Sequence, residues 1–264
     1  MPKRLFSVDP DPPHDQTATV GVLLIQLGTP DAPTPAALRR YLKQFLWDPR
    51  VIEMSRPLWW LILHLFILPF RPKKSARLYE NIWTPDGSPL LITSRRLTAA
   101  VREHLEDAGE APIHVALGMT YGRPSIASAL AELKSRGCRR LLILPLFSHY
   151  SSSSTGAAFD AVMRELTTWR WVPEIRTIHQ FHDHPGLIRA LAKAVREHWA
   201  EHGEGEKLVM SFHGTPKRYL LDGDPYYCHC QKTSRLLAEE LGLPGERYVV
   251  TFQSRFGREE WLEP

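Results

Sequence analysis

The sequence lacks several features that mark secreted, nucleotide-binding and membrane-spanning proteins. Its three cysteines in 264 residues are too few for a disulfide framework and favour a reducing compartment. Residues 1–18 are polar and carry no apolar core of a signal peptide, so we expect a disordered tail there. No glycine-rich phosphate-binding motif occurs, which argues against a dinucleotide or a nucleoside triphosphate. These absences favour a cytoplasmic protein without a nucleotide cofactor.

The charge of the chain is nearly balanced. The 33 Lys and Arg residues exceed the 29 Asp and Glu residues by a formal net charge of +4. No basic block interleaved with aromatic residues occurs, so we expect no nucleic acid among the partners. The small positive excess suits an anionic small molecule or a membrane surface.

Short apolar runs alternate with helical patterns along the chain. The length and β-branched content of these runs predict strands that are buried on both faces. Helical patterns that begin near Pro35, Pro124 and Pro185 predict right-handed βαβ units between them. We therefore predict an α/β fold with two Rossmann-like domains that have parallel sheets, at residues 19–175 and 176–264. The predicted strands are residues 22–27, 113–117, 141–147, 174–178, 208–212 and 248–252.

Polar motifs follow the carboxyl ends of the predicted strands. Ligands of open α/β sheets bind at that edge, so we expect these motifs to converge on a cleft between the domains. The motifs are Gly28-Thr29-Pro30, Met119-Thr120-Tyr121, Ser148-His149-Tyr150, His213-Gly214-Thr215-Pro216 and Gln253-Ser254-Arg255.

The most apolar segment, at residues 58–70, is 13 residues long. A bilayer span needs about 20 residues, so this segment is too short to cross a membrane. Trp59 and Trp60 near one end and Arg71 at the other favour an element that lies at a membrane surface or receives a hydrophobic ligand. A buried core helix is the alternative.

His213 is the first candidate for chemistry, because it stands where an apolar run stops. Imidazole acts as a base near neutral pH and binds borderline metals. A hydrogen-bonded histidine at a strand end is the alternative. Two other groups are less typical of metal sites. Cys228-His229-Cys230 lacks the ligand spacing of a zinc site. The FHDHPG segment, residues 181–186, precedes a predicted helix, which Asp183 could cap.

Several motifs, in order from about residue 21 to the chain end, resemble the ferrochelatase family, which inserts ferrous iron into a porphyrin to make haem. SFHGTP is similar to the catalytic-histidine motif of that family, and GDPY follows it there as well. The other motifs are LIQLGTP at residues 24–30, PDGSPL at 85–90, HYSSSSTG at 149–156 and QSRFGREEWLEP at 253–264.

The resemblance implies chelatase-type Rossmann-like domains and a set of site residues. His213 would bind the incoming metal or take a pyrrole proton. Arg71, Tyr79 and Ser88 match positions associated with porphyrin binding, and Tyr121 and Trp261 match aromatic residues that line the cleft. Residues 58–70 match an apolar lip that receives a hydrophobic porphyrin, often from a membrane. The expected partners are therefore protoporphyrin IX and Fe²⁺, with peripheral contact to the inner face of the membrane.

The sequence departs from the family pattern in three places. Ser152 stands where animal members have a cysteine of a [2Fe–2S] cluster, so we expect no cluster and no other cofactor, with Fe²⁺ as a substrate. Thr120 replaces a basic residue of many members. The family also continues past Pro264 with an acidic residue that faces the histidine, so we expect a fragment whose second domain is incomplete. Whether such a chain is active alone stays open.

Two alternative functions remain on sequence grounds. Another tetrapyrrole chelatase would insert cobalt or nickel and would prefer a more polar macrocycle than the lip at residues 58–70 suggests. A porphyrin-binding protein without catalysis is the other alternative, because no acidic partner of His213 can be assigned. The apolar lip favours protoporphyrin over coproporphyrin as the acceptor.

Overall fold

A computed structural model of the chain describes residues 6, 19–106, 112–255, 257 and 259–264. The tail predicted at residues 1–18 lies outside the described residues, apart from Phe6. The chain divides into two compact units: one contains Met1–Leu146 and Ser152–His179, the other Phe147–Ser151 and Gln180–Pro264. The domain boundary predicted after residue 175 stays a prediction, because compactness alone does not show where an independently folding domain ends.

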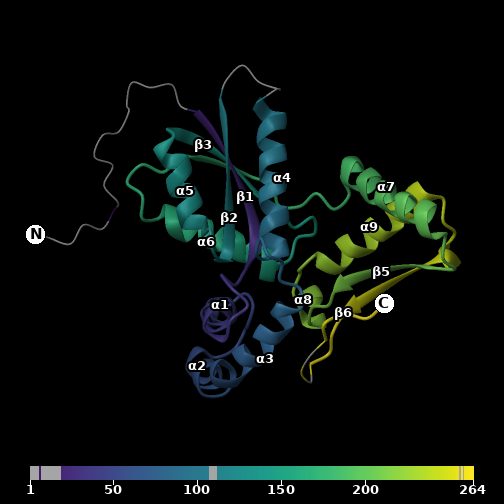
Figure 1. Cartoon of the computed structure of the whole chain (residues 1–264), viewed down its shortest axis with the longest axis horizontal. Coiled ribbons are helices and arrows are strands. Elements are labelled where there is room, and N and C mark those ends of the chain that lie inside the picture. Colours follow the sequence, from purple (N-terminus) through teal and green to yellow (C-terminus); the bar gives the residue numbers. More distant parts are fainter. Residues whose placement is uncertain (1–5, 7–18, 107–111, 256, 258) are drawn as a thin grey trace, which may run out of the picture. The chain divides into compact units, whose positions relative to one another are not determined.

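The first unit is built on a parallel sheet of four strands (Figure 1). The strand order is β2-β1-β3-β4. Three consecutive residues of the central strand, Leu23, Leu24 and Ile25, are 0% exposed, because helices cover both faces of the sheet. The bounds of the strands are β1 Thr19–Thr29, β2 Ile113–Gly122, β3 Cys138–Pro145 and β4 Glu174–Thr177.

Helices cover the two faces of this sheet. Val101 and Leu105 of α4 pack against Val22, Leu24 and Val115 on one face. Helix α5 contacts β1, β2 and β3, and Figure 1 shows it on the opposite side of β1 and β2 from α4. The bounds are α4 Pro89–Glu106, α5 Ile126–Ser135, η2 Ser152–Gly156 and α6 Ala157–Leu166, of which η2 is a π-helical turn.

The apolar segment at residues 58–70 is partly core and partly surface. It covers most of α2 Arg56–Ile62, all of η1 Leu63–Ile67 and the start of α3 Leu68–Glu80, where η1 is a π-helical turn. Helix α1, Pro35–Trp47, precedes them. Trp59, Leu63 and Leu68 are buried in a cluster with Tyr41 and Tyr121. Six neighbours on the other faces are exposed, so the core interpretation holds for only part of the segment, and contact with a membrane or a hydrophobic ligand stays a prediction. The exposed six are Leu58, Trp60, Leu61, Leu65, Phe66 and Phe70.

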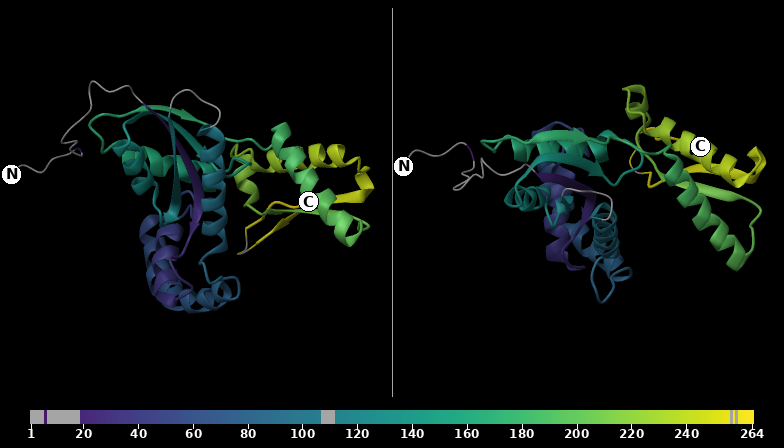
Figure 2. Two further views of the ribbon diagram at one scale, coloured as in Figure 1. Left: turned by 45° about the horizontal axis from the view of Figure 1, so that its top comes forward. Right: turned by 90° about the horizontal axis from the view of Figure 1, so that it is seen from above.

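The second unit carries a parallel pair of strands with helices on one face. Met210 of β5 packs against Ala192 of α7 and Leu237 of α9, whereas Val209, on the other face, is 59% exposed. Figure 2 gives two further views of α7 and α9 beside these strands. The bounds are α7 Pro185–His202, β5 Leu208–His213, α8 Lys217–Leu221, α9 Tyr226–Leu241, η3 Gly245–Arg247 and β6 Tyr248–Gln253.

The chain is thus a mixed α/β protein with two parallel sheets, and the predicted fold class is confirmed. Each of the six predicted strands coincides with an observed strand. None of the helices in the described ranges is long and apolar enough to cross a membrane.

Candidate active site

His213 is the last residue of β5 and pairs in register with Gln253, the last residue of β6. The chain turns away directly after it, with the Gly214 N–H donating to the Gln253 carbonyl oxygen at 2.7 Å. The imidazole is exposed. Desolvation by the surrounding protein nevertheless lowers the pKa of His213 below 6.5. The side chain is therefore largely uncharged at neutral pH, with a nitrogen lone pair for a metal or a proton.

Trp261 lies beside the loop that begins at His213. It forms an isolated antiparallel bridge with Pro216, and the Leu262 N–H donates to the Thr215 carbonyl oxygen at 3.0 Å. Trp261 is 5% exposed. Two of the predicted site residues, far apart in the sequence, are thus brought together in the second unit.

Tyr226 adjoins His213 and Asp224 adjoins Tyr226, and neither was among the predicted site residues. The Tyr226 phenol interacts with the main chain of His213, and burial raises the pKa of Tyr226. Asp224 accepts a hydrogen bond at Oδ1 from the Tyr226 N–H at 3.0 Å. The GDPY motif that follows SFHGTP was the available signal. It pointed to the family but not to a role for either residue.

The other predicted porphyrin-binding residues belong to the first unit. Ser88 precedes α4 and is 5% exposed, with its hydroxyl 2.8 Å from the Thr29 hydroxyl at the carboxyl end of β1. Arg71 is exposed on α3. Tyr79, near the end of α3, is half-buried, and desolvation raises its pKa. These three side chains therefore differ in their exposure to a ligand. Arg71 is exposed, Tyr79 is half-buried and Ser88 is buried against the sheet.

Tyr121 is a packing residue in this structure. It is 3% exposed, donates a hydrogen bond to Asp48 Oδ2 at 2.9 Å and makes an edge contact with Phe45 at 5.1 Å between ring centroids. Burial is the largest reason that the pKa of Tyr121 is raised. Its assignment to a porphyrin-facing surface stays a prediction.

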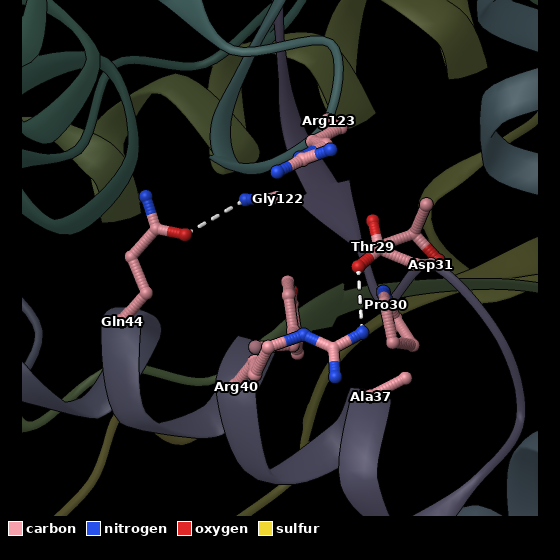
Figure 3. Close-up of a pocket in the computed structure, with 9 residues that line it drawn as sticks. Thr29, Pro30, Asp31, Ala37, Arg40, Gln44, Gly122 and Arg123 are labelled. Atoms are coloured by element: carbon pink, nitrogen blue, oxygen red, sulfur yellow. Dashed lines mark hydrogen bonds and ion pairs between the residues drawn. The ribbon is translucent and has the colours of Figure 1, made fainter.

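A small polar cavity of about 160 Å³ lies at the ends of β1 and β2. Figure 3 shows Arg40 and Gln44 projecting from α1 toward the loops that carry Thr29 and Gly122. Gln44 Oε1 accepts a hydrogen bond from the Gly122 N–H at 2.9 Å. Arg40 pairs with Asp31 at 3.0 Å. Polar groups thus gather at the carboxyl end of this sheet, but the cavity is too small for a macrocycle.

The histidines in and beside the FHDHPG segment do not converge on one point in the described part of the chain. His179 contacts Phe159 and Thr177, whereas His182 stacks on His229 with ring centroids 3.8 Å apart. Asp183 was expected to cap the following helix, and this was wrong. His184 is the N-cap residue of α7, accepting from the Gly186 N–H at 3.1 Å, while Asp183 pairs with Lys232 at 2.6 Å.

Cys228-His229-Cys230 lies in the first turn of α9, where successive side chains point in different directions. Cys228 is exposed and Cys230 is buried. Among the residues that the structure describes, no group of three or more histidine, cysteine, aspartate or glutamate side chains is arranged to hold a metal ion. His213 remains the candidate for contact with a metal that is transferred rather than stored.

Three histidines from distant parts of the sequence meet inside the second unit. The rings of His149 and His182 lie 6.0 Å apart, and His182 stacks on His229. Burial, together with the neighbouring histidines, lowers the pKa of His149 and of His229 to about 4 each. The cluster is therefore uncharged at neutral pH. Sequence analysis missed it because the three residues share no motif.

The cluster predicts that the free energy of unfolding decreases as the pH falls from about 6.5 toward 4. Unfolded histidines bind protons below about 6.5, whereas folded His149 and His229 stay neutral to about 4. We expect a loss on the order of 5 kcal/mol between pH 7 and 4.5 from the pair. Urea unfolding across this pH range measures it.

The matched variants separate this effect from the rest of the chain. H149Q/H229Q should flatten the dependence of unfolding free energy on pH. His198 and His202, an exposed stacked pair on α7, provide the control variant H198Q/H202Q, which should keep the dependence of the unsubstituted chain. Equal slopes in both double variants would contradict the assignment.

The family model and the curated relatives point to one family. The family model described as Ferrochelatase matches residues 19–264. A protein named Ferrochelatase from Nitrosococcus oceani is 57% identical over 251 residues, which are 95% of this chain and 68% of the relative. One of the same name from Thioalkalivibrio sulfidiphilus is 54% identical over 259 residues, 98% of this chain and 70% of the relative. The match to the structure of SirB from Bacillus subtilis with Fe³⁺ covers 91% of this chain and 68% of that chain, at 12% identity and a TM-score of 0.49.

Proposed function

The chain belongs to the ferrochelatase family, whose members insert ferrous iron into a porphyrin in haem biosynthesis, and we propose that it acts on protoporphyrin IX with His213 meeting the incoming metal. The observation that carries the proposal is the position of an exposed, largely uncharged imidazole at the end of β5, within a match that spans residues 19–264. The choice of protoporphyrin rests on the apolar side chains exposed on α2, η1 and α3.

The chemistry needs a neutral imidazole. Each Fe²⁺ that enters the ring replaces two pyrrole protons, so the products are the ferrous porphyrin and two protons. A base close to the ring accepts a proton as the metal enters, and imidazole is also a suitable ligand for Fe²⁺. His213 satisfies both requirements at neutral pH, because desolvation keeps its pKa below 6.5.

We propose that the residues matched by the family resemblance contact the porphyrin. Arg71 is exposed, and its guanidinium suits a propionate carboxylate, with Tyr79 and Ser88 as further polar contacts. Trp261 and Tyr121 are the aromatic candidates. The proposal for Tyr121 requires its ring to become accessible, since its hydroxyl is engaged by Asp48.

We propose further that the chain carries no [2Fe–2S] cluster and no other resident cofactor. Ser152 stands at the position of a cluster cysteine in animal members, and such clusters are held by thiolates. The Ser152 hydroxyl accepts a hydrogen bond from Arg50 Nη1 at 3.0 Å. Arg50 also donates to Asp160 Oδ1 at 3.0 Å, which fixes this part of the loop before α6.

Metal insertion tests the proposed function directly. The chain is mixed anaerobically with protoporphyrin IX and Fe²⁺, and the Soret band is followed. Conversion of the free-base spectrum to that of the metalloporphyrin supports the proposal. Binding without conversion would instead favour a porphyrin-binding protein without catalysis. Faster insertion of Co²⁺ or Ni²⁺ into a more polar macrocycle would favour another tetrapyrrole chelatase.

We propose a cytoplasmic protein, without a nucleic-acid partner, that contacts the inner face of the membrane through residues 58–70. Phe66 and Phe70 are 65% and 71% exposed. Transfer of two such rings into a lipid surface stabilises the bound state enough that F66S/F70S should lower partitioning onto anionic vesicles at least about tenfold. Flotation with vesicles of phosphatidylglycerol and phosphatidylethanolamine measures it.

The control for membrane contact is L221S. Leu221 is 75% exposed, but it lies on α8 in the second unit. L221S should partition like the unsubstituted chain. Equal partitioning of F66S/F70S and the unsubstituted chain would exclude residues 58–70 as the membrane contact.

A further inference from the structure

The segment Phe147–Ser151 belongs to the second unit, although the chain on both sides of it belongs to the first. Three contacts attach it there. His149 Nε2 lies 2.8 Å from Thr233 Oγ1, the Tyr150 N–H donates to His229 Nδ1 at 3.3 Å, and the Ser151 hydroxyl bonds Asp224 Oδ2 at 3.1 Å. The segment is thus held on α9 and on the turn that precedes it.

The hydrogen bonds of His149 define its tautomer. The Thr233 hydroxyl donates its hydrogen to the His182 carbonyl oxygen at 2.8 Å, so it can only accept from His149. His149 Nε2 therefore carries the proton, and Nδ1 accepts from the Ser148 hydroxyl at 2.9 Å. Burial keeps the pKa of His149 at about 4, so this neutral tautomer persists at neutral pH.

The His149 ring contacts two residues that adjoin His213. Its edge contact with Phe212, the residue before His213, has a centroid distance of 5.3 Å and an interplanar angle of 77°. It makes a second edge contact with Tyr226, at a centroid distance of 6.1 Å. Tyr226 in turn interacts with the main chain of His213. The ring therefore supports the end of β5 in two ways. It contacts the Phe212 side chain, and it contacts Tyr226, which interacts with the main chain of His213.

Support of this kind matters because β5 has few other neighbours. Within the described residues its sheet contains one further strand, β6. The β5 face that carries Val209 and His213 is exposed, whereas the opposite face packs on α7 and α9. Displacement of the Phe212 ring would consequently turn the main chain at His213, which has no packed side chain of its own to resist it.

We propose that His149, fixed by Thr233, is a positioning residue that holds Phe212 and Tyr226 and thereby sets the direction in which His213 meets the metal. The inference rests on the proposed role of His213. It assigns no direct contact with porphyrin or iron to His149. Its effect should therefore fall on the rate of insertion and not on porphyrin binding.

Substitution of His149 tests the proposal. H149F keeps an aromatic ring but removes the Nε2–H, and H149Q keeps an N–H donor for Thr233. We expect H149F to lower kcat for metal insertion about 10- to 100-fold, with the KM for porphyrin changed less than about twofold. H149Q keeps the donor but loses the ring that contacts Phe212 and Tyr226, so it should lower kcat as well. T233V should lower kcat as H149F does, and the H149F/T233V double variant should lose no more than either single variant.

The control is H198F, which places the same substitution at an exposed histidine on α7. It should leave kcat and KM unchanged. Full kcat in H149F or in H149Q would overturn the proposal. Failure of the unsubstituted chain to insert metal would count against the proposed function instead.

A second readout does not depend on activity. In ¹⁵N-histidine spectra of the unsubstituted chain, His149 should be protonated at Nε2 and not at Nδ1. The main-chain amide signals of His213 and Tyr226 should shift in H149F and stay in place in H198F. Unmoved signals in H149F would overturn the positioning role even if the chain proved inactive.

Discussion

H213A is expected to lower the rate of metal insertion at least about 100-fold, while porphyrin binding changes less than about threefold. The variant removes the imidazole at the end of β5 that we propose as metal ligand or base. It opens little space in the core, because the His213 side chain is exposed. Stopped-flow recording of the Soret band gives the insertion rate, and quenching of tryptophan fluorescence by porphyrin gives the binding.

Two controls separate chemistry from folding. H202A removes another exposed histidine, at the end of α7, and should insert metal at the unsubstituted rate. Free imidazole added to H213A should restore part of the rate, because the truncated side chain leaves room for it. An insertion rate in H213A equal to that of the unsubstituted chain would remove His213 from the mechanism.

The activity should also depend on pH through His213. Only the neutral imidazole binds iron or accepts a proton, and desolvation lowers the pKa of His213 from 6.5. Its contribution is therefore complete at neutral pH and is lost as the pH falls through that lowered pKa.

The strands were predictable because each carries a local signal. Leu23, Leu24 and Ile25 are fully buried in a row, which a strand covered on both faces requires and which an amphipathic helix does not produce. The candidate His213 was predictable for a related reason. An apolar run that ends abruptly in a polar motif marks the carboxyl end of a strand, and ligands of open α/β sheets bind at that edge.

The surroundings of the candidate site depend on contacts between distant residues and could not be predicted in this way. His149 meets Thr233 and Phe212 across more than sixty intervening positions each, and no periodicity records such a contact. The sequence places Tyr121 after a strand, whereas it is the penultimate residue of β2, where its hydroxyl bonds Asp48 and its ring is buried in the core. A side chain's direction at a strand end depends on the partner it finds.

G28A is expected to prevent stable folding of the first unit, with a loss of more than about 4 kcal/mol in the free energy of unfolding. Gly28 has a φ of +113°, a conformation that by itself costs an alanine about 1–2 kcal/mol. A Cβ atom there would also lie 1.7 Å from the Tyr121 carbonyl oxygen on the paired strand. Neither backbone can move without breaking the register of β1 and β2.

Gly87 separates the two parts of this effect. Its φ of +114° matches that of Gly28, but a Cβ atom there would meet nothing within 4 Å. G87A should therefore lose only the conformational part, about 1–2 kcal/mol. Urea unfolding followed by far-ultraviolet circular dichroism compares the two variants. Similar losses in both would mean that the strand ends relax around Gly28. A much larger loss in G28A would mean that close approach of β1 to β2 fixes the strand end that carries Thr29 and its contact with Ser88.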